Sequence, residues 1–496
     1  MLFTVLIVIS TVIVITLYVV GKCNERYWKK RGVTFYEKNR LTGPFLNFLT
    51  DKEPLFIHLY KIYQQYPNEP AVGIGGFFTP TLYIRDPANV QAVLSSDFNS
   101  FYHRGVEINE DDVLANNILF LNGNKWKLIR QSMTPLFTTS KLKSMFYIID
   151  KSAQDFLQYL KENKEIQKGD AFHTLSTFCS AAICATVFGV NAESIFDSPF
   201  LKIARGSFRS TLITNIQFLL SHFAQKFCQI LNIKAFKEFE DFFVGAIKQV
   251  IRQREIENIR RHDFADICIA LKNSGKLVDP DTGLELDPTD ELLAAQGFFF
   301  FVAGVEPIAT AMFATFVELG KNPEIQKRVQ DEVDGVFEKH SGSISYDIIS
   351  EMVYLDMVIK EAMRLHPAIG FVTRKCVEDT VLPVGNIKVD KGTKIFVPIY
   401  ELHHDPKYFP QPELFKPDRF SSENKHNILD ITYLPFGKGK RICIGMRYAH
   451  MQVKTGLVHI LRHFSIKTNI NKDGMKYMKH QIQVRLENVD VEFVPR

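Results

Sequence analysis

The sequence contains very little tryptophan, with two Trp beside 42 Phe in 496 residues. Its seven Cys are an odd number, are widely spaced and include no C-x-x-C pair. These features argue against a structural zinc site, an iron–sulfur cluster and a disulfide framework, and they favour a reducing compartment. The hydrophobic fraction of 46% and the charged fraction of 23% exclude a disordered, collagen-like or coiled-coil chain.

An excess of one charge is also lacking, because 60 basic and 55 acidic residues give a net charge of only +5. The sequence therefore predicts no nucleic-acid partner, which usually requires a concentrated basic patch. The Gly-rich stretch within residues 71–85 is not a phosphate loop, since no Lys-Ser/Thr follows it and it opens no helix. It predicts two short strands joined by a turn.

Residues 2–20 form an uncharged run rich in Val, Ile and Leu. As a helix with about 1.5 Å rise per residue, this run spans roughly 28 Å, near the hydrocarbon thickness of a bilayer. A cleaved signal peptide is the alternative, but the run is too long for one and no basic residue precedes it. Basic residues follow it instead, and positive charge stays on the cytosolic side. We therefore predict a single-pass signal anchor with the rest of the chain in the cytosol.

The anchor is expected at residues 1–21, a linker and membrane-docking segment at 22–55, and one large domain at 56–496. Aromatic residues favour the boundary between a membrane and water. The residues expected at that boundary are Tyr18, Tyr27 and Trp28.

The pattern from about residue 87 to 320 is mostly helical. Within it, the Phe-rich stretch 207–236 fits either a core helix pair or a membrane-dipping or substrate-access element, since an apolar face suits both. A long helix is predicted from Asp287, as its N-cap, to Leu319, and its nearly continuous apolar character indicates burial. Its middle, residues 303–307, contains Gly and Pro, which indicates strain or shaping around a ligand. Further helices are expected over 353–366 and from about 443–445 to 463, with short strands between them.

The most informative segment runs from Phe436 to Gly445 and has the pattern F-x-x-G-x-R-x-C-x-G. At roughly 5% usage per residue type, five fixed positions recur by chance in about one of several thousand chains of this length. With this motif the sequence resembles the cytochrome P-450 superfamily of haem-thiolate monooxygenases, and the resemblance covers essentially the whole chain. Four further family motifs occur in the expected order: Trp126 with Arg130, residues 303–306, Glu361 with Arg364, and residues 415–420.

The resemblance implies a mainly α fold with small β-sheets, preceded by an N-terminal transmembrane helix. It is strongest to the microsomal, insect-type detoxification branch, which implies an endoplasmic reticulum membrane, a haem b cofactor and a small apolar substrate. One atom of dioxygen would enter the substrate and the other would leave as water. Electrons would come from NADPH through a flavoprotein reductase, with cytochrome b5 as a further donor, because the chain has no flavin or nicotinamide motif of its own.

In this interpretation Cys443 is the thiolate ligand of the haem iron, and the start of the following helix is expected to lower its pKa. Phe436 would shield the sulfur, Gly439 would allow a tight turn, and Gly445 would pack on the porphyrin. Arg441 would pair with a haem propionate. The further propionate partners implied by the resemblance are Trp126, Arg130 and Arg374.

Glu361 and Arg364 share one helix face at i, i+3 spacing. A surface ion pair is the simpler interpretation, but the resemblance implies a buried set completed by Arg419. His366, His403 and His404 are disfavoured as axial ligands beside Cys443.

The segment Ala303–Gly304 would leave room for dioxygen, with Glu306 as a possible acid and Thr310 one turn further on. The Thr that usually follows the acidic residue is replaced by Pro307, which has no hydroxyl to relay a proton. Two alternatives therefore stay open: a haem-thiolate isomerase or dehydratase that needs no reductase, and a non-catalytic binder of hydrophobic ligands.

Family position also suggests which residues line the pocket and which face the reductase. The expected pocket residues are Phe298, Phe301, Ala303 and the stretch 104–120. The expected positive charges of the docking face are Lys438, Lys440, Arg447 and Arg130.

Overall fold

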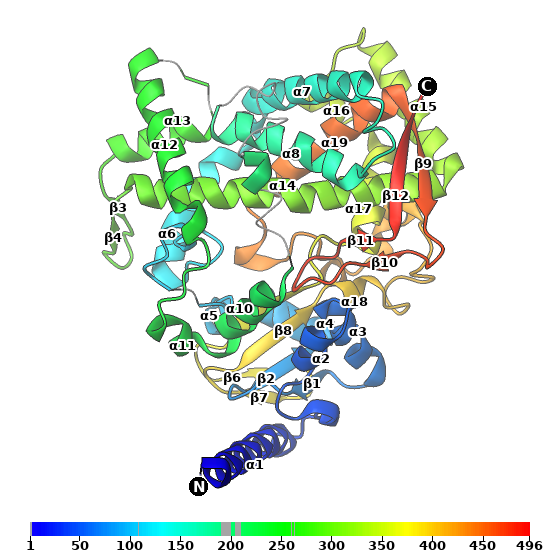
Figure 1. Ribbon diagram of the computed structural model, residues 1–496. Helices are drawn as coiled ribbons and strands as arrows, with labels where there is room; N and C mark the ends of the chain where they lie inside the picture. The colour runs from blue at the N-terminus through cyan, green and yellow to red at the C-terminus, as the bar shows by residue number, and fades with distance from the viewer. Residues whose placement is uncertain (1, 108, 190–199, 204–209, 259, 262) are drawn as a thin grey trace.

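A computed structural model describes residues 2–107, 109–189, 200–203, 210–258, 260–261 and 263–496. Helices dominate and the β-sheets are small, which confirms the predicted mainly α fold. Figure 1 shows the long helix α14 (Asp290–Lys321) crossing the molecule, with α7, α8 and α19 above it and the largest sheet below it. The site described below lies along α14.

The helices follow one another along most of the chain. Before α14 they are α1 (Leu2–Lys29), α2 (Phe45–Thr50), α3 (Leu55–Gln65), α4 (Pro87–Gln91), α5 (Phe98–Phe101), α6 (Gly123–Met133), α7 (Thr139–Glu162), α8 (Ala171–Val187), α10 (Leu212–Phe223), α11 (Gln225–Ile230), α12 (Lys237–Glu257) and α13 (Phe264–Asn273). After it they are α15 (Pro323–Lys339), α16 (Tyr346–Ile349), α17 (Val353–Leu365), α18 (Tyr400–His403) and α19 (Met446–His463).

The largest sheet has four strands in the order β1-β2-β8-β5, namely Ala71–Ile74, Thr81–Ile84, Lys394–Pro398 and Phe371–Lys375. Strands β1 and β2 form the antiparallel hairpin predicted for residues 71–85, and β8 joins β2 in parallel. The paired strands elsewhere are β3 (Leu277–Val278) with β4 (Glu285–Leu286), β6 (Thr380–Leu382) with β7 (Ile387–Val389), β9 (Phe464–Ile470) with β12 (Val489–Pro495), and β10 (Lys476–Tyr477) with β11 (Leu486–Glu487).

Helix α14 is buried along most of its length, as its apolar sequence predicts. Its start differs from the prediction, because Thr289 rather than Asp287 is the N-cap. The Thr289 hydroxyl accepts a hydrogen bond from the Leu292 amide at 3.2 Å, which satisfies one of the amides at the start of the helix. The helix continues through Pro307 without a break.

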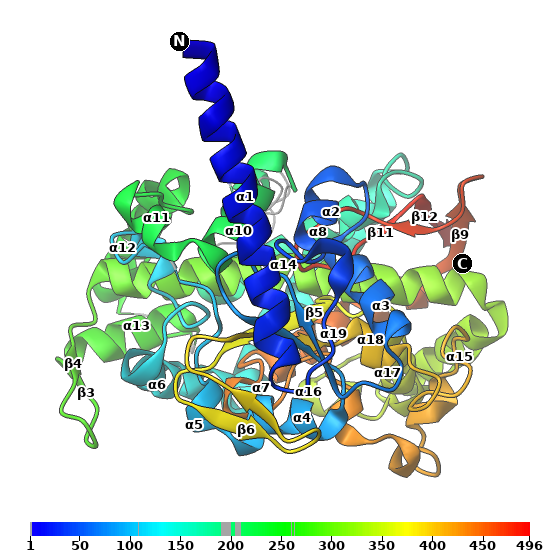
Figure 2. The ribbon, with the colours of Figure 1, turned by 90° about the horizontal axis from the view of Figure 1, so that it is seen from below.

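Helix α1 continues beyond the predicted boundary at residue 21, to Lys29. Its apolar part is long enough to cross a membrane by length and composition, and its side chains are mostly exposed. The prediction of Trp28 at a membrane interface is wrong, because its indole is fully buried against the strand at Gly73. The hydroxyl of Tyr27 donates to Asp390 at 2.8 Å. In Figure 2 the later turns of α1 lie over the domain and its N-terminal end projects beyond it.

The segment predicted as a linker, residues 22–55, is packed against the domain over much of its length. The Asn24 amide donates to the Phe77 carbonyl at 2.9 Å, and Arg40 pairs with Glu25 at 2.6 Å. Phe45 and Phe48 of α2 are fully buried. Membrane docking of this segment stays a prediction.

Helices α10 and α11 lie in the Phe-rich stretch 207–236, of which residues 207–209 fall outside the described part of the chain. The interpretation as a core helix pair is wrong for much of their surface, which is apolar and exposed. The exposed side chains are Leu212, Ile213, Ile216, Phe227, Ile230 and Leu231. One side of α10 does pack inward, since the ring of Phe223 lies 4.8 Å from that of Phe45.

Candidate functional site

Cys443 lies in the loop that enters α19, two residues before the N-cap Gly445. Its amide donates to the Phe436 carbonyl at 3.0 Å, which closes the loop on itself. Gly439 has φ +72°, and a side chain there would collide with the backbone of Leu94. Glycine is therefore required both for the turn and for the packing of the loop on residues 94–95.

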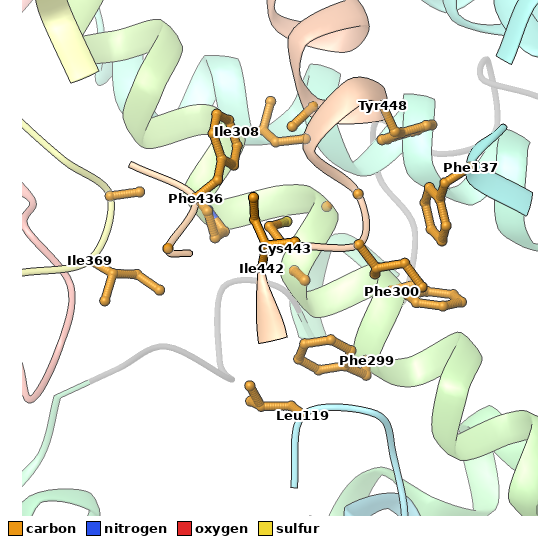
Figure 3. A pocket seen from close by; sticks show the side chains of 18 of the residues that line it. Leu119, Phe137, Phe299, Phe300, Ile308, Ile369, Phe436, Ile442, Cys443 and Tyr448 are labelled. Atoms are coloured by element: carbon orange, nitrogen blue, oxygen red, sulfur yellow. The ribbon is translucent and has the colours of Figure 1, made fainter. Parts of the chain in front are cut away.

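The Cys443 side chain faces a cavity of about 270 Å³. Figure 3 shows the sulfur at the centre, with Phe299 and Leu119 on one side and Ile308 and Phe436 on the other. Nearly all of these walls are apolar, as a pocket for a large hydrophobic group requires.

Four arginines line the same cavity: Arg104, Arg130, Arg374 and Arg441. Among the described residues, none of the four forms an ion pair with a carboxylate. The Arg441 guanidinium lies 4.2 Å from the centre of the Trp126 ring and donates to the carbonyls of Tyr102 and Leu121. Arg441 Nη1 and Arg104 Nε remain buried without a partner in the described part of the chain.

Burial lowers the pKa of all four arginines, that of Arg104 to about 10 and that of Arg374 to about 9. Mutual repulsion acts in the same direction, since Arg104 lowers the pKa of both Arg374 and Arg441. A cluster of buried positive charges requires an anion, because an unpaired buried charge is costly in free energy. The two propionates of haem supply such anions, so the arginine cluster fits this cofactor.

The sequence predicted a lowered pKa for the Cys443 thiol, but in the polypeptide chain itself that pKa is raised. Burial raises the pKa of its thiol, while the Gly445 amide and the charges of Arg130 and Arg104 lower it. The expected lowering by the helix start is present, but burial outweighs it. The side chain is nonetheless exposed to the cavity, so the sulfur is open to a metal bound there.

Glu361 and Arg364 on α17 form a fully buried ion pair at 2.8 Å. Arg419 also contacts the Glu361 carboxylate, at 3.2 Å, and the Lys416 amide donates to it at 2.9 Å. Arg364 in turn donates to the carbonyls of His403, Pro412 and Leu414. The set therefore ties α17 to the loop before the Cys443 segment.

His403 connects this set to the cysteine loop. Its Nε2 accepts from the Leu434 amide at 2.8 Å, and its Nδ1 lies 3.2 Å from the Arg364 carbonyl. Both nitrogens are thus engaged, and burial holds the pKa of His403 well below its usual range. His366 is likewise bonded, to Glu318 at 3.1 Å, and His404 to the Tyr400 carbonyl at 2.7 Å. None of the three lines the cavity.

Helix α14 presents Ala303, Gly304 and Pro307 to the cavity. Gly304 lets α14 approach α8, because a Cβ there would lie 2.6 Å from the Ile183 side chain. Glu306 and Thr310 are buried but do not line the cavity. The Glu306 carboxylate lies 3.6 Å from Arg485, and burial raises its pKa to about 7.

Two pocket predictions are wrong. Phe298 and Phe301 do not line the cavity and instead pack around Phe243, at ring distances of 5.0 and 5.7 Å. Phe299 and Phe300 line it in their place. Because α14 is apolar on almost every side, its sequence carries no signal for which residues face inward.

From the stretch 104–120, the residues that line the cavity are Arg104, Ile118 and Leu119, with residue 108 outside the described part. Arg104 was predicted only as one member of this stretch and not as a charged site residue. Arg104 is a single arginine in a loop and belongs to no motif, so the sequence offers no reason to select it.

A cysteine that is exposed to an apolar cavity, beside a cluster of arginines, fits a haem-thiolate site on a helical fold. The family model for cytochrome P450 matches residues 39–493. The chain is 33% identical over 477 residues to cytochrome P450 6k1 of Blattella germanica, covering 93% of this chain and 91% of that protein. It is 35% identical over 461 residues to cytochrome P450 6j1 of the same species, covering 91% and 89%. It is also 32% identical over 474 residues to cytochrome P450 6B7 of Helicoverpa armigera, covering 94% and 93%.

The chain belongs to the cytochrome P450 family. Members of this family are haem-dependent monooxygenases that hold haem b through a cysteine thiolate, so the predicted enzyme class and cofactor are confirmed. The similarity to insect proteins predicted from the motifs is confirmed as well.

Proposed function

We propose that the protein is a membrane-anchored monooxygenase that oxidises small apolar substrates with dioxygen and electrons from an NADPH-dependent flavoprotein reductase. The observation that carries this proposal is the Cys443 side chain, which faces an apolar cavity beside four arginines that pair with no carboxylate of the described residues. When bound, haem supplies the iron at which dioxygen is activated.

The residues of the chain have separate tasks in this proposal. Cys443 binds the iron, and Arg104, Arg130, Arg374 and Arg441 bind the propionates as charge-assisted partners. Trp126 supports the Arg441 guanidinium from the face of its ring. Phe436 covers one side of the sulfur, Gly439 shapes the loop, and Gly445 leaves the cavity wall open where α19 begins. The buried set of Glu361, Arg364 and Arg419 positions the loop that leads to the cysteine.

Membrane attachment rests on two apolar surfaces. The exposed apolar part of α1 is of membrane-spanning length, and α10, α11 and the residue that follows α11 together expose six large apolar side chains. Phe78 and Leu46 add two more exposed side chains on segments that pack near α10. An endoplasmic reticulum membrane with the large domain in the cytosol agrees with the basic residues that follow the apolar run.

Electron donors are proposed to dock near the cysteine loop, where Lys440 and Arg447 are exposed. Lys438 pairs with Asp430, which reduces its availability. Arg130 lines the cavity and is assigned to the cofactor rather than to this docking surface. The reductase is the proposed principal donor, and cytochrome b5 is proposed for the same face.

A second function, rearrangement or dehydration without a reductase, is favoured by one observation. Pro307 occupies the cavity wall where a hydroxyl would assist proton delivery, and Glu306 points to Arg485 instead of the cavity. A binder without catalysis is the third outcome of the same test. Product analysis with and without NADPH and reductase separates them. The monooxygenase requires both, the isomerase or dehydratase turns over a hydroperoxide or an oxime without them, and the binder forms no product.

A further inference from the structure

Pro307 lies inside α14, four residues after Ala303. In a helix the amide of residue 307 would donate to the carbonyl of residue 303, but proline has no N–H. The Ala303 carbonyl therefore lacks its helical donor. Such a carbonyl must be satisfied by another group or remain a buried, unpaired acceptor.

The direction of this carbonyl follows from Ala303, which bears it, and from Pro307, which lies one turn later. Ala303 and Pro307 both line the cavity, and residues four apart lie one above the other on a helix face. A proline ring also pushes the carbonyl four residues before it away from the helix axis. The carbonyl accordingly opens toward the cavity. Its turn is held in place by the close packing of Gly304 on Ile183.

The neighbouring cavity wall offers the carbonyl no hydroxyl donor. Among the described residues that line the cavity, the hydroxyl groups are those of Thr186 and Tyr448, and they lie 2.9 Å from each other. The Thr186 hydroxyl also donates within α8 to the carbonyls of Ala182 and Ile183. The other neighbours on α14, Phe300 and Ile308, are apolar.

We propose that the Ala303 carbonyl is a hydrogen-bond acceptor for the substrate, and that preferred substrates are apolar molecules carrying one hydroxyl or N–H donor. This inference rests on the proposed function and adds the substrate class to it. A molecule without a donor leaves the carbonyl unpaired and binds less tightly.

The test compares hexan-1-ol with its methyl ether, which keeps the oxygen but lacks the donor. Binding of each to the full-length, haem-loaded protein is measured by calorimetry. Because the two probes differ in hydrophobicity, the ratio of their affinities is compared between variants. The Pro307→Ala variant restores the backbone N–H that satisfies the carbonyl. We expect the preference for the alcohol to be about 3- to 10-fold larger in the parent protein than in this variant.

The matched control is Pro323→Ala, at the first turn of α15, where the helix needs no amide donor. This variant should keep the preference of the parent. Should Pro307→Ala fold poorly, Pro307→Val restores the same N–H. Equal affinity ratios in the parent and the Pro307 variants would overturn the inference. Failure of the proposed function is a different result, namely no NADPH-dependent product from either probe.

Discussion

The Glu361 carboxylate is fully buried and contacts two guanidinium groups, those of Arg364 and Arg419. Removing it leaves Arg364 as a bare charge inside the protein, which costs about 3–5 kcal/mol. We predict that Glu361→Ala yields little haem-loaded protein, measured as bound haem per polypeptide. The control is Glu351→Ala, whose carboxylate pairs with Lys339 near the surface and should matter little. Normal haem incorporation in Glu361→Ala would refute the structural role.

We predict that the Glu306 carboxyl makes the free energy of unfolding of the protein depend on pH. Burial raises its pKa from 4.5 to about 7, so ionising it costs the folded state stability as the pH rises through this range. We expect Glu306→Gln to be more stable than the parent at pH 8, by about 3 kcal/mol at most. The advantage should disappear at about pH 3.5, below the ordinary pKa of 4.5, where the folded and unfolded states both carry the proton.

Urea unfolding at the two pH values measures this difference, with the exposed Glu338→Gln as control. A constant advantage across the pH range would contradict the assignment of the effect to the Glu306 proton.

Where residues belong to a spaced motif, the sequence predicted which of them lie together in the structure. Cys443 and Arg441 follow from the pattern of residues 436–445, and the Glu361–Arg364 pair follows from its helical spacing. Arg104 could not be assigned in the same way, because its role depends on a fold that brings its loop beside β5 and the cysteine loop.

Helix α14 shows what an element's sequence leaves open. Its burial was predictable from its apolar composition. Its rotation about its own axis was not, because a helix that is apolar on every face does not show which face turns toward the cavity. Packing against the neighbouring elements, α8 above all, sets the rotation that turns Phe299 and Phe300 toward the cavity. Its start was predicted two residues too early, because Thr289 rather than Asp287 caps the helix.

Placing a hydroxyl at position 307 of α14 tests whether Pro307 lowers the amount of product formed per NADPH consumed. We expect Pro307→Thr to raise the amount of product formed per NADPH consumed, because a threonine hydroxyl on the cavity wall can pass protons. NADPH consumption and product are measured in the same reaction with reductase. Pro307→Val is the matched control, since it restores the backbone N–H and a similar shape without the hydroxyl. Equal coupling in all three proteins would count against the proton-delivery argument.

We predict that the C-terminal turn of α1 stabilises the large domain and does not serve to contact the membrane. Trp28 is fully buried, and truncation of a buried Trp costs about 3–5 kcal/mol. We expect Trp28→Ala to lower the free energy of unfolding of the large domain by this amount. Tyr18→Ala, at an exposed position of the same helix, should leave it unchanged. Equal effects of the two substitutions would contradict the packing of α1 on the sheet.

At the level of the whole chain, the order of the motifs was sufficient to predict the fold, and the family match over residues 39–493 agrees with it. The attachment of α1 to the domain was not predictable, because hydropathy marks where the apolar run ends and not where the helix ends. Glu25 and Lys29 extend the helix as an i,i+4 pair at 2.8 Å, and Trp28 then meets the sheet at Gly73.

The proposed function requires the Cys443 sulfur to be the ligand of a haem iron. The most direct measurement is the absorption spectrum of the reduced, full-length protein under carbon monoxide, recorded for the parent and for Cys443→Ser. We predict the Soret band typical of a thiolate-ligated haem in the parent and its loss in the variant. Absence of that band in haem-loaded parent protein, or the same band in both proteins, would contradict the account.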